Sequence, residues 1–243
     1  LYREIKQSLT DLDKMFTLMD REREVADVPN APELNCQHSA HLKFENVSFA
    51  YEPDRPILHN ISFEIPSGKT VAVVGPSGSG KSTLLGILAT LDRPSMGELW
   101  VCGQAVHTLT EEQRAQVRLE NIGFVFQSFQ LLPQLSALEN VMLPLRLQPD
   151  FNFKQAEKKA LQWLERVGLV RQAQQTPKVL SGGEQGRMLF GKLMLAKTNV
   201  LLMDEPTHHM DMESIESLNT ALDKYKGTLF FVSHDREFVS SIA

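Results

Sequence analysis

A glycine-rich segment follows an apolar run, and its residue types suit phosphate binding. The run covers Val71 to Val74, and the segment after it reads Gly75-Pro76-Ser77-Gly78-Ser79-Gly80-Lys81-Ser82-Thr83. A strand, a glycine turn and a helix in succession let backbone N–H groups converge on phosphate oxygens, with the positive end of the helix behind them. Lys81 adds a mobile positive charge, Ser82 a hydroxyl for Mg²⁺, and Thr83 a further polar group. The segment predicts a P-loop; a glycine turn without function is the alternative for this pattern taken alone.

Two carboxylates stand at the end of a second apolar run, where α/β proteins place their ligands. The run is Val200 to Met203, and Asp204 and Glu205 follow it. We expect Asp204 to reach Mg²⁺ through water, and Glu205 to polarise an attacking water as general base, a role that accelerates a reaction by about 10² to 10⁴. An isolated Asp-Glu pair is more often a solvated turn before a helix. After a buried strand downstream of a P-loop, it indicates phosphoryl chemistry.

A third segment reads Leu180-Ser181-Gly182-Gly183-Glu184-Gln185. Together with the P-loop and Asp204-Glu205, it resembles the signature sequence of the ABC-type ATPases. Ser181 and the amides of the two glycines are expected at a helix N-terminus, a second anion-binding end. The resemblance implies a head-to-tail dimer in which the signature of one copy closes over ATP held by the P-loop of the other. ATP, Mg²⁺ and a second copy of the chain are therefore the expected ligands and partner.

Four further residues fall where the family places functional groups. The resemblance implies that Tyr51 stacks on adenine, that Gln127 senses Mg²⁺ and the attacking water, that His234 contacts the γ-phosphate, and that Asp211 ends the loop that crosses the dimer interface. Each residue alone is weak evidence, because strand aromatics are commonly core residues and a lone histidine is usually a surface residue. Glu205, His234 and Gln127 are the expected catalytic groups.

The composition excludes several classes of function. The 243 residues are 42% hydrophobic and 23% charged, which is an ordinary globular balance. The net charge of -5 gives no sign of a basic surface, so no direct nucleic-acid partner is expected. Cys36 and Cys102 lack metal-ligand spacing and suit a reducing cytosol. No apolar run approaches the ~20 residues of a membrane span, so we expect a cytoplasmic protein, or one docked through a partner on the cytoplasmic or matrix face of a membrane.

The apolar pattern predicts the elements that position these groups. Leu1 to about Met19 has helical periodicity, whereas alternation with period two, with a one-residue slip after Phe44, predicts antiparallel strands from Leu42 to Ile65. Beyond the P-loop, strands alternate with helices, which indicates a mainly parallel sheet. The expected helices are Lys81 to Ala89, Glu111 to Glu120, Ser181 to Ala196 and Asp211 to Tyr225, with a mostly helical stretch from Gln130 to Gln172 broken at Pro133 and Pro144. The expected strands are Leu99 to Val101, Ile122 to Phe126, Val200 to Met203 and Thr228 to Val232.

With the resemblance, these elements predict an α/β fold of the P-loop NTPase (RecA-like) type: a mainly parallel core sheet with an antiparallel β subdomain and a helical subdomain. Residues 1–34 are expected to form an amphipathic helix and linker, and residues 35–243 the nucleotide-binding domain, with the helical subdomain at about 128–185. The chain begins at Leu1 rather than Met and ends soon after His234, where family members generally add strands. The start at Leu1 suggests a piece of a longer protein, and the early end suggests an uncovered sheet edge that encourages association.

Different parts of the chain resemble different subfamilies. The part up to the P-loop is similar to mitochondrial-type half-exporters, Leu85 to about Leu147 to lipoprotein-release and macrolide-exporter ATPases, and Leu180 to Ala243 to bacterial ABC-F ATPases. This predicts a recombined or designed sequence, with a divergent natural relative as the alternative. The pair His208-His209 also departs from the family's commoner residues, and adjacent histidines without further ligands do not indicate a metal site.

The resemblance implies that the chain binds MgATP, dimerises over it and hydrolyses it to ADP and phosphate as the motor of a membrane transporter with a transmembrane partner. An ABC-F-like, ribosome-associated translation factor is a second class, although such proteins usually carry two domains and a long basic linker. A designed chimera with no cellular partner is a third. Co-purification of membrane subunits, of ribosomes or of neither separates the three.

Overall fold

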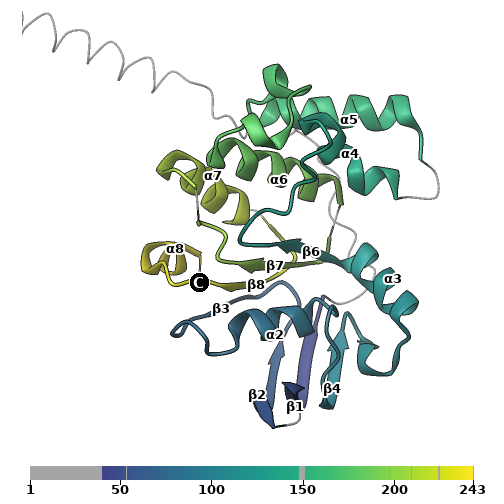
Figure 1. The fold of residues 1–243 in the computed structure, drawn as a ribbon, viewed down its shortest axis with the longest axis vertical. Helices are drawn as coiled ribbons and strands as arrows, with labels where there is room; N and C mark the ends of the chain where they lie inside the picture. Colours follow the sequence, from purple (N-terminus) through teal and green to yellow (C-terminus); the bar gives the residue numbers. More distant parts are fainter. Residues whose placement is uncertain are drawn as a thin grey trace, which may run out of the picture.

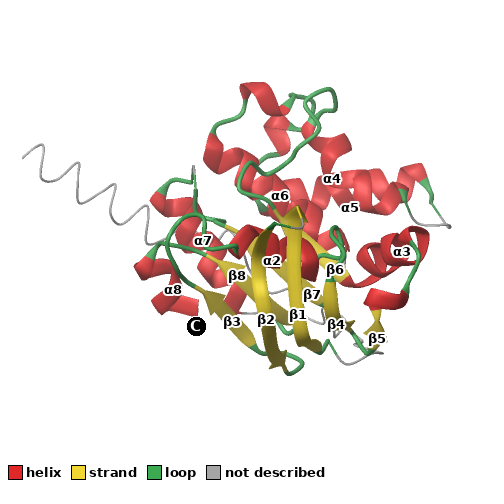
Figure 2. Cartoon of the chain, turned by 60° about the horizontal axis from the view of Figure 1, so that its bottom comes forward, coloured by secondary structure: helices red, strands yellow, loops and turns green. Residues whose placement is uncertain are grey.

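The computed structural model describes residues 40–52, 54–147, 151–196, 198–208, 210–223 and 225–242. The helix and linker expected over residues 1–34 lie outside this range. The described residues form an antiparallel sheet, a parallel sheet and a group of helices (Figure 1, Figure 2). Among the helices of the described ranges, none combines the length and apolar character that crossing a membrane requires.

The antiparallel sheet begins with a long hairpin. Strands β1 (Leu42–Glu52) and β2 (Arg55–Ile65) pair with each other, and β4 (Met96–Val101) and the short β5 (Gln104–Ala105) extend the sheet in the order β2-β1-β4-β5. The pairing register of β1 and β2 shifts between Phe44 and Val47, both of which are buried. The predicted slip is therefore confirmed as an irregularity that keeps both apolar halves of β1 on the core face.

The strands of the parallel sheet end next to the residues that are expected to do chemistry. Its order is β3-β8-β7-β6, formed by β3 (Thr70–Val73), β8 (Thr228–Val232), β7 (Val200–Asp204) and β6 (Ile122–Val125). All three pairings are parallel. The two central strands are almost wholly apolar because both of their faces are covered. The predicted mainly parallel core sheet is thus confirmed.

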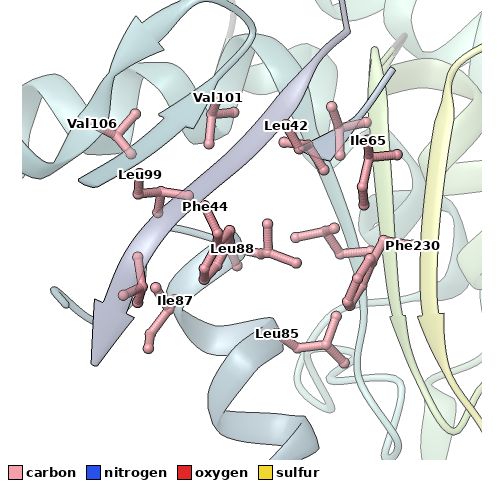
Figure 3. Packing of buried hydrophobic residues seen from close by; sticks show 14 of the residues in the cluster. Leu42, Phe44, Ile65, Leu85, Ile87, Leu88, Leu99, Val101, Val106 and Phe230 are labelled. Atoms are coloured by element: carbon pink, nitrogen blue, oxygen red, sulfur yellow. The ribbon is translucent and has the colours of Figure 1, made fainter. Parts of the chain in front are cut away.

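Each face of the parallel sheet packs against a different layer. Helix α2 (Lys81–Leu88) lies between the two sheets, and Phe44, Leu88 and Phe230 belong to the core cluster that joins these elements (Figure 3). The opposite face packs on α6 (Gly182–Ala196), α7 (Met212–Asp223) and α8 (Arg236–Ile242). Side chains alternate between the faces, so that Leu202 belongs to the first cluster and Met203 to the second.

A separate core holds the helical part together. Helices α4 (Ala137–Arg146), α5 (Phe153–Arg166) and α6 share a cluster that includes Val141, Leu164 and Met188. Helix α3 (Glu111–Asn121) lies outside this cluster and leads into β6. The 3₁₀ turns Val106–Thr108, Val170–Gln172 and Pro177–Val179 complete the connections.

The predicted break at Pro144 is wrong, because α4 runs through this residue to Arg146. A proline here removes only the N–H that would bond to the Asn140 carbonyl, close to the end of the helix. The interactions at the start of the helix offset the loss of this hydrogen bond. The side chains of Ser136 and Glu139 form a reciprocal capping box, and the fully buried Asn140 amide donates to the carbonyls of Leu132, Leu135 and Ser136.

Candidate active site

A cavity of about 930 Å³ opens at the carboxyl ends of the parallel strands. It brings together the P-loop, the two carboxylates at the end of β7 and the groups that follow β6 and β8. Its volume is in the range of small-molecule and cofactor sites. The lining residues are Arg55, Pro56, Ile57, Gly75, Pro76, Ser77, Gly78, Ser79, Gly80, Lys81, Ser82, Thr83, Gln127, Asp204, Glu205, His208, Val232 and His234.

The P-loop geometry depends on a glycine at the start of α2. Gly80 caps the helix with φ 84°, and an added Cβ would lie 3.0 Å from Ile57 Cγ2 and 3.1 Å from Leu58 Cδ2. Glycine is the residue that satisfies both the left-handed backbone and this close approach. The Nζ of Lys81 donates to the carbonyls of Gly75 (2.8 Å) and Pro76 (2.7 Å), so the loop curls around the ammonium. The charge is held at the centre of the loop.

The floor of the cavity suits a hard cation. Asp204 is partly buried, and this burial raises the pKa of its carboxyl, although a hydrogen bond from Ser82 acts in the opposite direction. The Ser82 hydroxyl and the Asp204 carboxylate are therefore adjacent oxygen donors, and oxygen donors are what Mg²⁺ prefers. Both predicted metal-site oxygens thus meet at one place, and Gln127 lines the same cavity.

Glu205 occupies a strained position. Its φ is 48°, which is uncommon for a residue with a side chain, and its N–H donates to the Val232 carbonyl at 2.9 Å. Its Oε2 accepts from the backbone N–H of His234 at 3.2 Å and lies 2.7 Å from the ring Nδ1 of the same residue. Strain of this kind persists where the surroundings over-determine the conformation, and it is typical of functional sites.

The signature segment lies elsewhere. Ser181 caps α6 by accepting from the N–H of Glu184 at 3.2 Å, while the Glu184 carboxylate accepts from the Ser181 N–H at 2.8 Å. The bond from this N–H holds the pKa of Glu184 below its usual value. A Cβ on Gly183 would lie 2.5 Å from Asp211 Oδ2, so the signature and the start of α7 are in direct contact. Ser181, Gly182, Gly183 and Asp211 are not among the described residues that line the cavity.

Tyr51 also lies outside the cavity lining. It is 64% exposed near the end of β1, with its ring edge-on to Phe49 at 4.8 Å between centroids. Its neighbours across the hairpin are Arg55 and Pro56, which do line the cavity. Stacking of Tyr51 on adenine stays a prediction.

Sequence reasoning missed several cavity walls, namely Arg55, Pro56, Ile57, His208 and Val232. The first three come from β2, which approaches the P-loop only through the tertiary fold. His208 had a signal, since it follows Asp204 and Glu205 closely. The neighbouring His209 lies outside the described residues.

Comparison with known proteins finds one matching family profile and relatives with similar sequences. The profile of the family described as ABC transporter matches residues 58–208. The lipoprotein-releasing system ATP-binding protein LolD of Coxiella burnetii is 36% identical over 220 residues, which are 88% of this chain and 91% of that protein. The uncharacterized ABC transporter ATP-binding protein YbbA of Escherichia coli K12 is 42% identical over 193 residues, covering 78% of this chain and 84% of YbbA.

Solved structures agree with the sequence matches. The ATP-binding cassette MJ0796, in a dimeric post-hydrolysis state bound to ADP and Pi, is 32% identical with a TM-score of 0.74, over 82% of this chain and 90% of that one. A bacterial Atm1-family ABC exporter with ATP bound is 28% identical with a TM-score of 0.71, over 98% of this chain and 42% of the exporter. The predicted P-loop NTPase fold with its antiparallel subdomain is confirmed by these likenesses.

Proposed function

The chain belongs to the ABC transporter family and is an ABC-type ATPase, and on that basis we propose that it binds MgATP, pairs head to tail with a second copy over two ATP molecules and hydrolyses them to ADP and phosphate. The convergence of Lys81, Asp204, Glu205 and His234 on one cavity is the observation that carries this proposal. The MJ0796 cassette, dimeric and bound to ADP and Pi, supports it.

Binding begins at the P-loop. The bonds that Lys81 makes to the Gly75 and Pro76 carbonyls are exchanged for stronger charge-assisted bonds to the β- and γ-phosphates. The loop amides and the positive end of α2 face the same oxygens. Mg²⁺ would be held by Ser82 and Asp204, with Gln127 nearby, and would neutralise charge on the phosphate oxygens.

We assign to Glu205 the role of the general base that activates the water attacking the γ-phosphate. The carboxylate is oriented by His234 through the backbone N–H and the ring nitrogen, both of which contact Oε2, and the carboxylate accepts a proton from the water. The bond to His234 fixes the direction of the base, and the bond from the Glu205 N–H to the Val232 carbonyl ties its backbone to the end of β8. His234 is then placed beside the phosphate that leaves.

A site shared between two copies explains why the signature segment lies away from the cavity that contains the P-loop of the same chain. Ser181 and the N-terminus of α6 form a second anion-binding end, and Ser181 is not among the described residues that line the cavity. In a head-to-tail pair this end closes over the γ-phosphate bound by the other copy, and Asp211 lies beside the signature at the interface. Hydrolysis therefore requires two copies.

We assign the physiological role of transporter motor on the cytoplasmic face of a membrane, with a transmembrane partner. A second cavity, of about 640 Å³, supports the proposal that such a partner binds. We call it the α3–α6 groove, lined by apolar side chains from β6, α4 and α6 that include Phe124, Phe126, Leu143, Leu189 and Leu193. Gln127 lines the nucleotide cavity, and two residues further on Phe129 lines the groove, so a short loop links the two. Phe129 and Gln130 have φ of 56° and 43°, so this loop is strained.

Steady-state phosphate release tests the proposal. The purified chain should release phosphate from ATP in the presence of Mg²⁺ and stop when EDTA is added, with a rate per molecule that rises with protein concentration because the site needs two copies. A rate per molecule independent of concentration would contradict the composite site. Absence of turnover with intact ATP binding would remove the enzymatic part of the proposal.

The ribosome-associated alternative and a mosaic origin are kept as predictions. The ABC-F-like residues of the part from Leu180 support the first, and the three subfamily resemblances support the second. A mosaic predicts poor packing where segments meet, near 84–91 and between 149 and 178, and therefore faster amide exchange at these joints than in β3 and β7. Uniform exchange across 128–180 with well-packed joints would favour a single lineage. The LolD alignment, which runs through 220 residues, accords with that outcome.

A further inference from the structure

Arg55 adds a guanidinium to the wall of the nucleotide cavity, which also holds the ammonium of Lys81. The Arg55 side chain is exposed, and among the described residues its guanidinium forms no ion pair and donates no hydrogen bond. The acidic residues closest to it in sequence, Glu52 and Asp54, thus do not neutralise it. A guanidinium in an anion-binding cavity keeps all its donors for the oxygens of a ligand.

The strand that carries Arg55 fixes the place of this side chain. Strand β2 is the edge strand in the order β2-β1-β4-β5, so its outer side is free to lie along the P-loop. Pro56 follows directly and restricts the backbone of Arg55 to extended conformations. A proline is tolerated there because an edge strand does not need every N–H for its ladder. The backbone of Arg55 is therefore set before a ligand binds.

The end of the β1–β2 hairpin places Arg55 at a definite point along the cavity. A Cβ added to Gly80 would lie 3.0 Å from Ile57 Cγ2 and 3.6 Å from the Ile57 carbonyl oxygen, so β2 touches the start of α2. The pairing register shifts here, and Tyr51 and Ile57 fall between paired positions, an irregularity that re-aims side chains. Arg55, opposite Glu52, is two residues or about 7 Å further along the strand. It therefore stands between the start of α2 and the hairpin end that carries Tyr51.

The proposed binding mode decides which part of ATP passes this point. Lys81 takes the β- and γ-phosphates, Glu205 faces the γ-phosphate, and Tyr51 is predicted to stack on adenine. The α-phosphate and the ribose connect these two ends, and of the two only the α-phosphate is charged. A planar guanidinium matches the oxygens of a phosphate with two parallel hydrogen bonds.

We propose that Arg55 binds the α-phosphate of the nucleotide, so that the retention of ATP and of ADP depends on it to the same extent. This inference rests on the proposed nucleotide site. The α-phosphate keeps its charge and its bonds while the γ-phosphate leaves, so the contact is the same in substrate, transition state and product. Such uniform binding lowers KM without raising kcat, and it holds ADP in the site after hydrolysis.

Calorimetric titration of the wild type and Arg55→Ala with a series of ligands locates the contact. The affinities for ATP and for ADP should each fall at least about fivefold and by the same factor. The affinity for GTP should fall by that factor too, because the base is not read. Inorganic pyrophosphate, which fills the β and γ positions alone, should bind both proteins equally. Arg55→Lys keeps the charge but not the planar fork, and should lie between the two.

Kinetics provides a readout that a merely structural arginine would not produce. Arg55→Ala should raise KM for ATP at least about fivefold and leave kcat at saturating ATP within about twofold of the wild type. The melting temperature without nucleotide should stay that of the wild type, because the side chain is exposed, and this shows that the variant is folded. Arg146→Ala, at the exposed end of α4 and outside the cavity lining, is the matched control and should behave as the wild type throughout.

The outcomes separate this inference from the proposed function. Unchanged affinities for ATP and ADP in Arg55→Ala would overturn it. A larger loss for ATP than for ADP would move the contact to the γ-phosphate, and a loss that differs between ATP and GTP would move it to the base; either result overturns the assignment to the α-phosphate. Failure of the wild type itself to bind ATP would contradict the proposed function, and the inference with it.

Discussion

Oε2 of Glu205 lies 2.7 Å from Nδ1 of His234 and accepts from the backbone N–H of the same histidine at 3.2 Å. These two contacts connect the end of β7 to the end of β8 at the mouth of the cavity. They hold the carboxylate in one orientation while its backbone is in the left-handed region. The proposed base is therefore placed by its neighbours before any substrate arrives, which is what a positioned catalytic group requires.

Glu205→Gln should lower turnover by about two orders of magnitude or more, because the amide keeps the shape of the side chain but cannot accept the proton of the water. ATP binding should persist. Phosphate release measures the first effect, and size-exclusion chromatography with ATP should show a larger dimer fraction than in the wild type. Glu237→Gln, on the exposed face of α8, is the control. Wild-type turnover in Glu205→Gln would exclude Glu205 as the base.

Lys81→Ala should weaken ATP binding at least about tenfold, because a charge-assisted hydrogen bond to phosphate is worth about 1.5 to 3 kcal/mol. The variant also loses the bonds to the Gly75 and Pro76 carbonyls, so the P-loop should exchange its amide hydrogens faster. Calorimetric titration with ATP checks the affinity, and the exposed Lys159→Ala on α5 should behave as the wild type does. An unchanged affinity would remove the P-loop assignment.

Asp204→Asn should stabilise the protein in the absence of nucleotide and abolish the stimulation of phosphate release by Mg²⁺. Burial raises the folded-state pKa of Asp204 above its ordinary value of 3.8, so the ionised carboxylate opposes folding. This penalty is absent below pH 3.8, grows as the pH rises through the folded-state pKa and is complete above it. The gain in melting temperature over the wild type should therefore be larger at pH 7 than near pH 3.8, where the carboxyl begins to ionise in the unfolded chain. Equal or negative shifts at both pH values would contradict the assignment.

The local motifs could be predicted because the residues of each motif lie close together in the sequence. A strand, a glycine turn and Lys81 are contiguous, and Asp204 ends β7 with Glu205 directly after it, so the ends of neighbouring parallel strands bring them to the same edge. The slip after Phe44 was predictable for the same reason, since alternation of burial changes phase within a few residues.

Other features depend on contacts between distant segments. Arg55 reaches the nucleotide cavity because β2 lies beside the P-loop, and nothing in the spacing of the chain signals that approach. Pro144 looked like a break, yet the capping box of α4 and the buried Asn140 amide carry the helix past it.

Complementation between two inactive variants tests the composite site most directly. Ser181→Arg places charge and bulk at the start of α6 and should block hydrolysis while the monomer still binds ATP, whereas Lys81→Ala removes the phosphate contact. In a mixed head-to-tail dimer, one of the two sites combines an intact P-loop with an intact signature. Mixing the two proteins should therefore restore phosphate release to a maximum near equal ratios. No recovery at any ratio, once mixed dimers are demonstrated by differential labelling, would contradict the head-to-tail arrangement.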